Sequence, residues 1–519
     1  MPAAPRSLPW PVAAFAMSMA IAWSCSPDAR AASPRPNIVF ILADDLGYGD
    51  LGCYGATQVD TPNIDRLARA GMRFTDAHSP SAVCTPTRYA LMTGQYAWRH
   101  PAGSRILSGV APLCIPKGRL TLPALLKEAG DTTGVVGKWH LGLGEGETDY
   151  NGSIAPGPRE VGFDSSFIIP ATGDRTPCVY VEDGRVVGYD PADPIRVSYG
   201  KPIGAEPTGA QSPALLKVRP SHGHDNTIIN GISRIGFMTG GTAARWDDEE
   251  MADRITRKAV DFIEANKGRR FFLYFATHDV HVPRVPHPRF RGTSRHGTRG
   301  DAIHELDWCV GRVLAALEEN RLADDTLVLF TSDNGGVMDD GYQDGSGDDT
   351  SGHRCNGRLR GFKGGLYEGG SRVPFIARWP GKVPAGKVSK ALISHVDLLA
   401  TVAALTGKSL PDGAGPDSVN QVPSLLAEEP ETPCRDSLVI HGGGGRLALR
   451  QGPWKLIPGR AGDVGGKAEL YNLDDDIGEA NDLALRDPDK VKVLAERLKG
   501  IREGEPGRTD PPSTTGDTP

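Results

Sequence analysis

Five short runs of apolar residues, none long enough for a typical globular helix, restrict the architectures open to this chain. Their length and composition are typical of strands buried on both faces of a sheet. Amphipathic helical patterns separate them, at residues 251–265, 301–321 and 394–405. Alternation of such strands and helices indicates a sheet covered by helices. The five runs are 37–42, 133–136, 271–276, 327–330 and 373–377, and all five are expected to be parallel strands.

We therefore predict an α/β fold with a large mixed, mostly parallel sheet sandwiched by helices, and a smaller C-terminal α+β subdomain. The main domain is expected over residues 34–427, with a Gly- and Pro-rich, loop-rich insertion at 172–241. Three short apolar runs and a charged helix place the subdomain at 428–502. Residues 503–519 carry Pro, Thr, Asp and Gly without an apolar run and are expected to be disordered.

Residues 1–31 have the pattern of a secretory signal peptide. Arg6 supplies a positive charge, and residues 12–23 are apolar but too few to cross a bilayer comfortably. Small residues at −3 and −1 favour cleavage after Ala31, which predicts an exported protein, periplasmic or secreted. Lipoprotein anchoring through Cys25 is the alternative. No later segment reaches about 18 consecutive apolar residues, so no membrane span is expected in the mature form.

Charge and cysteine content exclude several classes of protein. The chain has 58 basic and 64 acidic residues, a net charge of −6, and no polybasic block, so we expect no nucleic-acid partner. Its eight cysteines contain no CxxC pair, so neither a zinc site nor a redox motif is predicted. Loss of Cys25 with the leader would leave seven, an odd number that allows one free or chemically special cysteine.

Polar side chains follow four of the apolar runs at the point where each predicted strand ends. Because the carboxyl ends of parallel strands meet at one edge of a sheet, these groups are expected to lie together. They are Asp44 and Asp45 after 37–42, Lys138 and His140 after 133–136, His278 and His281 after 271–276, and Asp333 and Asn334 after 327–330.

Three carboxylates and one amide in that set suit a hard divalent cation rather than zinc. Each of the sequences Asp-Asp-x-Gly and Asp-Asn-Gly, taken singly, is typical of a capped turn. Placed together behind two buried strands, they predict a site for one ion, Ca²⁺ with Mg²⁺ as the alternative.

A further segment, 81–88, reads Ser-Ala-Val-Cys-Thr-Pro-Thr-Arg and precedes Leu-Met-Thr-Gly at 91–94. Taken alone, Cys84 is typical of a small buried residue. Residues 84–88, however, fit C-x-P-x-R, and the chain resembles the type I, formylglycine-dependent sulfatases, arylsulfatase-like members of the alkaline phosphatase superfamily. The resemblance covers about 36–483 and includes the motifs at 44–50, 137–140, 332–336, 363–370 and 470–473 with Gly478-Glu479.

The resemblance implies a catalytic sulfatase domain at 34–427 that hydrolyses sulfate monoesters. A formylglycine-generating enzyme would convert Cys84 to formylglycine, whose hydrate attacks sulfur with one hydroxyl and expels sulfate with the help of the other. The family's metal ligands correspond to Asp44, Asp45, Cys84, Asp333 and Asn334. Its other catalytic residues correspond to Arg88, which holds the hydrate, Lys138 and Lys363, which bind sulfate, His140, which assists turnover, and His281, which protonates the leaving oxygen.

Several assignments stay open at this point. His278 competes with His281 as the proton donor, although Val282-Pro283 follows His281 as in the family. Thr172 stands where some members have a serine near the leaving group, and it is left out of the predicted set. A polar rim favours sulfated carbohydrate over a steroid or simple aryl sulfate. The candidate rim residues are Asp174, Arg175, His222, His224, Asp225, His353 and Arg354.

Two other functions fit parts of the sequence. A phosphonate or phosphate ester hydrolase of the same superfamily can also use formylglycine, so Cys84 does not exclude it. An inactive secreted glycan-binding protein on the same scaffold is the non-enzymatic alternative, and the complete set of predicted catalytic residues argues against it.

Overall fold

The computed structural model describes residues 35–347, 352–427, 434–459 and 467–505. They belong to one compact unit of the chain, which begins at Arg35. The predicted signal peptide, with Cys25, lies outside the described residues, as does the predicted disordered tail beyond residue 505. These two segments and the domain limits proposed above stay predictions.

A ten-stranded mixed sheet forms the centre of the fold, and its five middle strands are parallel. Strand β1 lies between β13 and β12, with Val39 opposite Val328 and Leu273. The strand order is β15-β2-β14-β13-β1-β12-β4-β5-β6-β7. The strands are β1 (Asn37–Ala43), β2 (Met72–Phe74), β4 (Thr132–Lys138), β5 (Ser165–Ile169), β6 (Val181–Glu182), β7 (Arg185–Val186), β12 (Phe271–Ala276), β13 (Thr326–Ser332), β14 (Phe375–Arg378) and β15 (Lys387–Ser389).

All five predicted apolar runs are strands of this sheet, but one runs in the opposite direction to the prediction. Strand β14 is antiparallel to β13, whereas run 373–377 was expected to be parallel. Burial on both faces produces the same apolar run in either direction, so the sequence pattern carries no information on direction. Because β14 returns beside β13, the connection at 333–374 starts and ends at the same edge of the sheet.

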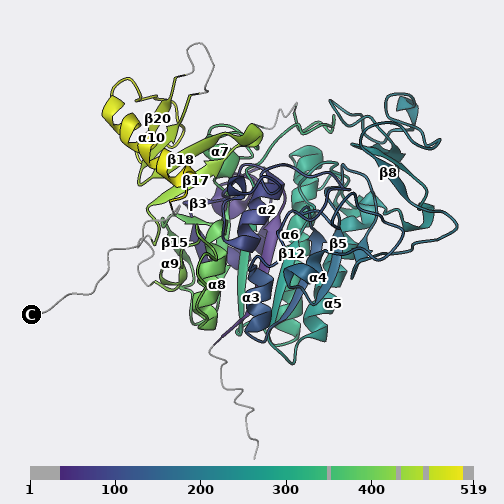
Figure 1. Cartoon of the computed structure of the whole chain (residues 1–519), viewed down its shortest axis with the longest axis horizontal. Helices are drawn as coiled ribbons and strands as arrows, with labels where there is room; N and C mark the ends of the chain where they lie inside the picture. The colour runs from purple at the N-terminus through teal and green to yellow at the C-terminus, as the bar shows by residue number, and fades with distance from the viewer. Residues whose placement is uncertain (1–34, 348–351, 428–433, 460–466, 506–519) are drawn as a thin grey trace, which may run out of the picture. The chain divides into compact units, whose positions relative to one another are not determined.

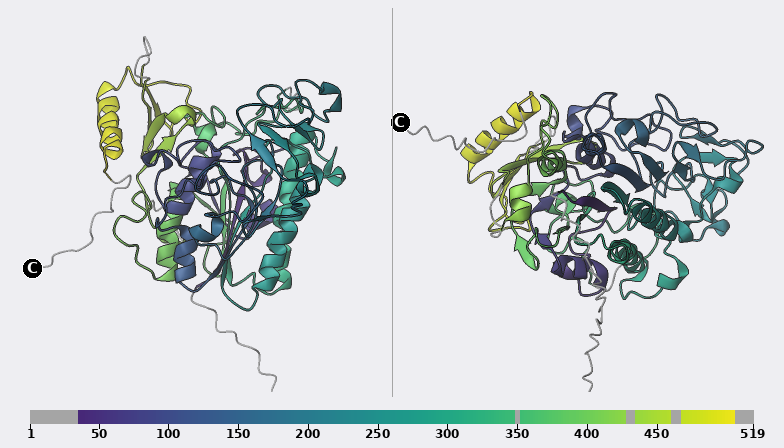
Figure 2. Two further views of the ribbon diagram at one scale, coloured as in Figure 1. Left: turned by 45° about the vertical axis from the view of Figure 1, so that its right-hand side comes forward. Right: turned by 90° about the horizontal axis from the view of Figure 1, so that it is seen from below.

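Two groups of helices cover the two faces of the sheet (Figures 1 and 2). Helices α1 (Pro62–Arg69), α5 (Met251–Ala265) and α6 (Gly297–Glu319) contact one another on one face. Helices α2 (Cys84–Thr93), α3 (Leu122–Glu128) and α8 (Leu398–Thr406) contact one another on the other. The predicted helix 251–265 is α5, and α6 begins four residues before the predicted 301. Short helices are α4 (Pro158–Val161), α7 (Glu368–Ser371) and α9 (Val422–Leu426).

A separate antiparallel sheet follows near the C-terminus, as the sequence predicts. Its four strands are β17 (Ser437–His441), β18 (Leu447–Gln451), β19 (Trp454–Ile457) and β20 (Glu469–Asn472). Helix α10 (Pro488–Arg502) buries Leu494, Leu498 and Ile501 in the same apolar cluster. That cluster also contains Ala90 and Tyr96, so it reaches α2 and its following loop.

The region between β5 and α5 contains short strand pairs rather than a second large sheet. Strand β8 (Arg196–Ser198) pairs with β11 (Phe237–Thr239), and β9 (Ile228–Ile229) pairs with β10 (Ile232–Ser233). A third small pair joins β3 (Ala77–His78) to β16 (Ile393–Ser394). Within the described ranges, no helix combines the length and apolar character that crossing a membrane requires.

Candidate active site

Strands β1 and β13 end side by side, and four fully buried polar side chains follow them. Asp44 and Asp45 come directly after β1, and Asp333 and Asn334 come directly after β13. The Asn334 Nδ2 atom donates to Asp45 Oδ1 at 2.7 Å. Asp45 has a left-handed backbone with φ +57°, a conformation that is uncommon for residues other than glycine and recurs at functional sites.

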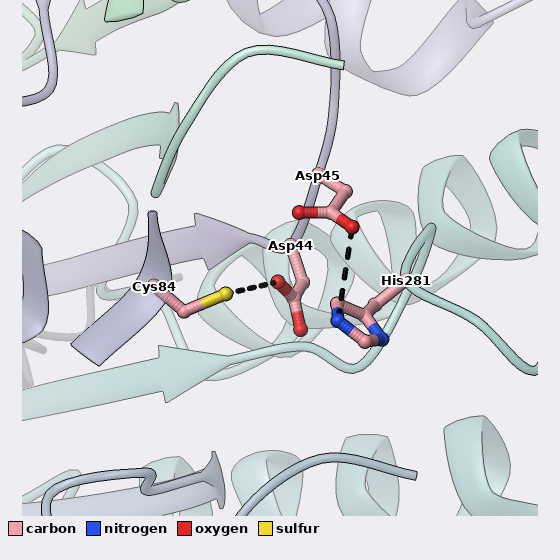
Figure 3. A group of neighbouring side chains, drawn as sticks. All are labelled: Asp44, Asp45, Cys84 and His281. Carbon is pink, nitrogen blue, oxygen red and sulfur yellow. Dashed lines mark hydrogen bonds and ion pairs between the residues drawn. The ribbon is translucent and has the colours of Figure 1, made fainter. Parts of the chain in front are cut away.

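Residue 84 lies beside this group at the first turn of α2. The Cys84 Sγ atom is 3.7 Å from Asp44 Oδ1, and the side chains of Asp44, Asp45, Cys84 and His281 point toward one another (Figure 3). A helix N-terminus carries a positive potential, which favours an anion at residue 84. Pro86 is tolerated there because backbone N–H groups of the first turn lack intrahelical partners. Burial, followed by the charge of Asp333, raises the pKa of the Cys84 thiol.

Three cations surround the carboxylates: Arg88 and Lys138 are fully buried, and the Lys363 side chain is 10% exposed. Lys138 Nζ lies 2.5 Å from Asp44 Oδ2, and Lys363 Nζ lies 2.8 Å from Asp45 Oδ2. Arg88 binds Asp333 Oδ2 through Nε at 3.0 Å and Nη2 at 2.7 Å, and donates through Nη1 to the Lys138 carbonyl. This dense set of positive groups suits a bound oxyanion.

Burial and charge shift the pKa values of these groups in different directions. Burial, with Asp333 adding to it, raises the pKa of Asp44 to about 7. Burial also opposes ionisation of Asp333, but Arg88 and Lys138 lower the pKa of that carboxyl below its usual value. In the metal-free site Asp44 therefore holds a proton more readily than Asp333.

The chemistry of the donor set fits a divalent metal ion. Within the described part of the chain, the buried Asn334 Oδ1 atom has no hydrogen-bond partner. The ionised carboxylates around it are also acceptors and cannot supply one. Ligand atoms of Asp44, Asp45, Cys84 and His281 lie within 4.8 Å of one another. Three carboxylates and an amide oxygen are the donors that Ca²⁺ and Mg²⁺ take. The residues present therefore fit such an ion.

His281 lies at the edge of the carboxylate group, His278 lies beside His281, and His140 follows the end of β4. The His281 Nε2 atom is 3.8 Å from Asp45 Oδ2, and its Nδ1 pairs with the Val282 carbonyl at 2.6 Å. The His278 Nδ1 atom lies 3.8 Å from Asp279 Oδ1, and the ring centroids of His278 and His281 are 6.1 Å apart. His140 Nε2 pairs with the Leu107 carbonyl at 2.9 Å. Burial, then Lys138, lowers the pKa of His140.

Three of the candidate rim residues form one cluster. Asp174 Oδ2 lies 2.9 Å from His224 Nε2, and Arg175 Nη1 lies 3.0 Å from Asp174 Oδ1. Thr172 Oγ1 contacts both Asp174 and Arg175, so it braces this pair. Burial opposes the charge of Arg175, but Asp174 raises its pKa.

The remaining rim candidates lie in other surroundings. His353 Nε2 pairs with Asp50 Oδ1 at 2.8 Å, behind the loop that follows β1. His222 contacts the Ser221 hydroxyl at 3.0 Å. Asp225 Oδ1 accepts from Asn226 Nδ2 at 3.2 Å and is exposed, as is Arg354. None of these contacts joins the residue to the carboxylate group.

The structure adds one acidic residue that the sequence analysis did not identify. Asp340 Oδ2 lies 2.6 Å from Lys363 Nζ and 3.7 Å from His281 Nε2. Asp340 stands in a loop rich in Asp and Gly, where a carboxylate is ordinary, so only its tertiary contacts distinguish it. The structure also explains Gly137, the first residue of the motif at 137–140: with φ +101°, a Cβ there would overlap the Ala276 carbonyl oxygen, so only glycine allows β4 to deliver Lys138.

Comparison with known proteins agrees with this geometry. The sulfatase family model matches residues 36–408. N-acetylgalactosamine-6-O-sulfatase of Bacteroides thetaiotaomicron is 49% identical over 482 residues, covering 91% of this chain and 94% of that protein. Steryl-sulfatase of Mus musculus is 35% identical over 465 residues, covering 82% and 70%.

A solved structure from the glycosaminoglycan metabolism of Bacteroides thetaiotaomicron superimposes with a TM-score of 0.87. It is 49% identical and is covered completely, while the match spans 91% of this chain. Together with the mostly parallel sheet, these matches identify a hydrolase of the alkaline phosphatase superfamily. More closely, the chain belongs to the sulfatase family, and it is a sulfuric ester hydrolase.

Proposed function

We propose that this enzyme is an exported, formylglycine-dependent sulfatase that removes 6-O-sulfate from amino sugar residues of sulfated glycans. One observation carries the mechanism: residue 84, four buried metal-type ligands and three cations, two of them fully buried, converge where β1, β4 and β13 end. The substrate class rests on the 49% identity to an N-acetylgalactosamine-6-O-sulfatase and on the cluster of Asp174, Arg175 and His224.

In this proposal Asp44, Asp45, Asp333 and Asn334 hold one divalent ion, Ca²⁺ or Mg²⁺, beside residue 84. The bound ion supplies positive charge that neutralises the sulfate ester and lowers the pKa of the attacking hydroxyl. The formylglycine hydrate at residue 84 supplies that hydroxyl. Arg88 fixes the geometry, because its three hydrogen bonds tie Asp333 to the Lys138 carbonyl.

The two lysines and two histidines have separate proposed tasks. Lys138 and Lys363 bind sulfuryl oxygens, where their charge stabilises the transition state. His281, protonated in the complex with substrate, gives its Nε2 proton to the sugar oxygen as the S–O bond breaks and keeps the Nδ1 proton, which it donates to the Val282 carbonyl. Burial and the charges of Lys363 and Lys138 lower the pKa of His281, so the bound sulfate must offset those charges for His281 to carry this second proton. His140 acts as a base on residue 84. Its Nε2 pairs with the Leu107 carbonyl, and Nδ1 has no partner among the described residues.

The sugar is proposed to be recognised by Asp174, Arg175 and His224. Asp174 and Arg175 are largely buried and already paired, so they present hydrogen-bonding groups in fixed positions. A site built to bind a sugar hydroxyl discriminates strongly against a substrate that lacks it, because the buried polar groups are left unpaired. An apolar steroid offers no such groups.

The first experiment establishes the chemistry at residue 84. Peptide mass spectrometry of the exported protein, made with a formylglycine-generating enzyme, is expected to find formylglycine at position 84. The verified enzyme is then assayed on 4-nitrophenyl sulfate, a phosphate diester and a phosphonate monoester. The proposal requires the highest kcat/KM on the sulfate ester; a preference for the phosphonate would favour the alternative hydrolase, and no turnover of any sulfate ester would favour a glycan-binding protein.

The second experiment tests the substrate class. The substrates compared are N-acetylgalactosamine 6-O-sulfate, N-acetylgalactosamine 4-O-sulfate and N-acetylglucosamine 6-O-sulfate. The kcat/KM is expected to be at least about tenfold higher on the first than on the other two. The Asp174→Asn variant is expected to lower kcat/KM on the preferred sugar while changing that on 4-nitrophenyl sulfate less than about twofold. Equal losses on both substrates would place Asp174 outside sugar recognition.

A further inference from the structure

Lys363 lies between two carboxylates that differ in their surroundings. Its Nζ atom is 2.8 Å from Asp45 Oδ2 and 2.6 Å from Asp340 Oδ2. The Asp45 side chain is fully buried, whereas that of Asp340 is 31% exposed. The two contacts therefore place one partner of the ammonium inside the site and the other toward solvent.

The two partners also differ in what an ion would do to them. Asp45 belongs to the group that fits the divalent metal, so a bound ion would compete with Lys363 for its charge. Asp340 is absent from that group and keeps its contact with Lys363. It also lies 3.7 Å from His281 Nε2, so it borders the space proposed for the sulfate and the leaving oxygen.

The loop holds Asp340 in place without help from Lys363. The neighbouring Asp339 accepts hydrogen bonds from the Ser221 hydroxyl at 2.7 Å and from the Gly341 N–H at 3.0 Å. The Gly341 carbonyl accepts from the Ser221 N–H at 2.9 Å. Gly341 has φ +112°, and a Cβ there would overlap the His224 ring, so the loop packs tightly on the proposed sugar cluster.

We propose that Asp340 competes with sulfate for the Lys363 ammonium and thereby weakens the binding of the product more than that of the substrate. The inference rests on the proposed function of the site. A sulfate ester carries one negative charge, whereas inorganic sulfate carries two. Coulombic repulsion from a fixed carboxylate is therefore about twice as large for the product as for the substrate. Asp340 in this role is a positioning residue that speeds release of sulfate after hydrolysis.

The test is the Asp340→Asn variant of the metal-loaded, formylglycine-verified enzyme. The amide keeps the shape of the side chain and removes its charge. The competitive inhibition constant of inorganic sulfate is expected to fall about fivefold or more, while KM for the sulfated sugar falls about twofold. Both effects should shrink as the salt concentration rises, because Asp340 is partly exposed.

Asp339→Asn is the matched control, since it removes the same charge one residue away and an amide oxygen can still accept from Ser221 and Gly341. Its inhibition constant for sulfate is expected to stay within about twofold of the wild type. An unchanged constant in Asp340→Asn, or weaker binding of both sulfate and substrate, would overturn the inference. Weaker binding of both would mean that Asp340 only holds Lys363 in position.

Failure of the inference and of the proposed function can be told apart. If the wild-type enzyme hydrolyses sulfate esters but the two variants bind sulfate alike, only the inference fails. If the wild type hydrolyses none, the proposed function fails. In that case, calorimetric titration of the metal-loaded proteins with sodium sulfate still gives the dissociation constant of sulfate for Asp340→Asn and for Asp339→Asn, and the two values can be compared.

Discussion

Residue 84 decides whether the site can complete a catalytic cycle. Replacement of Cys84 by alanine removes the side chain from which formylglycine is made, and no turnover is expected. Cys84→Ser supplies one hydroxyl but no second hydroxyl to expel sulfate, so at most one slow sulfation per molecule is expected. Intact-protein mass spectrometry after incubation with a sulfate ester checks both variants. Multiple turnover near the wild-type rate by either variant would contradict the proposed chemistry.

Arg88 contributes to stability through a geometry that lysine cannot reproduce. Its guanidinium is fully buried and donates three hydrogen bonds, two to Asp333 and one to the Lys138 carbonyl. Arg88→Lys leaves at least one of these buried acceptors without its donor, so the free energy of unfolding is expected to fall by about 3 kcal/mol. Urea unfolding of the metal-free protein measures this change.

The control for this variant is an ion pair of similar length at the surface. Arg66 Nη1 lies 2.6 Å from Glu318 Oε1, and both side chains are nearly half exposed, at 46% and 49%. Arg66→Lys is expected to change the free energy of unfolding by less than about 0.5 kcal/mol. Equal effects of the two substitutions would show that burial of Arg88 adds nothing to its contribution.

At the scale of elements, the end of β17 connects the C-terminal sheet to the catalytic loops. The Ala82 N–H donates to the His441 carbonyl at 2.8 Å, and the Gly364 N–H donates to the Ala82 carbonyl at 2.7 Å. The Gly443 N–H donates to the Gly364 carbonyl at 2.8 Å. This chain of hydrogen bonds fixes the segment before residue 84 against the loop that carries Lys363.

Gly443→Pro removes one donor from that chain, and Gly443→Ala keeps it. Gly443 is exposed, so the loss of this hydrogen bond costs at most about 1 kcal/mol, but it loosens the Lys363 loop. We expect KM for the sulfated substrate to rise about fivefold in the proline variant and less than about twofold in the alanine variant. Steady-state kinetics with circular dichroism as a check of folding measure this. Equal values for the two variants would exclude a role for the Gly443 donor.

The sequence predicts these elements better than it predicts their relationships. The apolar runs of β1, β4, β12 and β13 are strands because their composition suits burial on both faces, and α5 matches its periodic pattern throughout. The direction of β14 was missed because burial does not encode direction. Asp340 was missed because its contacts with Lys363 and His281 come from loops far apart in sequence.

At the scale of the whole molecule, a buried charge cluster joins the C-terminal sheet to α7 and to the segment around β3. Glu368 accepts from Lys455 of β19 at 2.9 Å and from Arg372 at 2.9 Å, and Lys455 also lies 2.8 Å from Glu479. Asp76 and His78 complete the cluster beside Arg450. Asp76, His78 and Glu368 have the spacing of a metal site, but Arg and Lys side chains already neutralise the carboxylates.

The stability of the whole chain should depend on pH through the metal site. Asp44 has a pKa of about 7 in the folded, metal-free protein against 3.8 as its ordinary value. The folded state therefore holds an extra proton between these pH values. A raised carboxyl pKa stabilises the folded state below the ordinary value, and that contribution is lost as the pH rises through about 7. For this group the slope reaches about 1.4 kcal/mol per pH unit.

A bound divalent ion reverses this trend, because it requires the ionised carboxylate and its binding releases the proton. The gain in Tm on adding Ca²⁺ is therefore expected to widen as the pH rises toward about 7 and to level off above it. Scanning calorimetry of the protein with Ca²⁺ and with a chelator, from about pH 5 to pH 8, measures the gain. Asp44→Asn has no proton to release, so its gain in Tm should vary little with pH. A gain in the wild type that is equally insensitive to pH would show that Asp44 does not control metal binding.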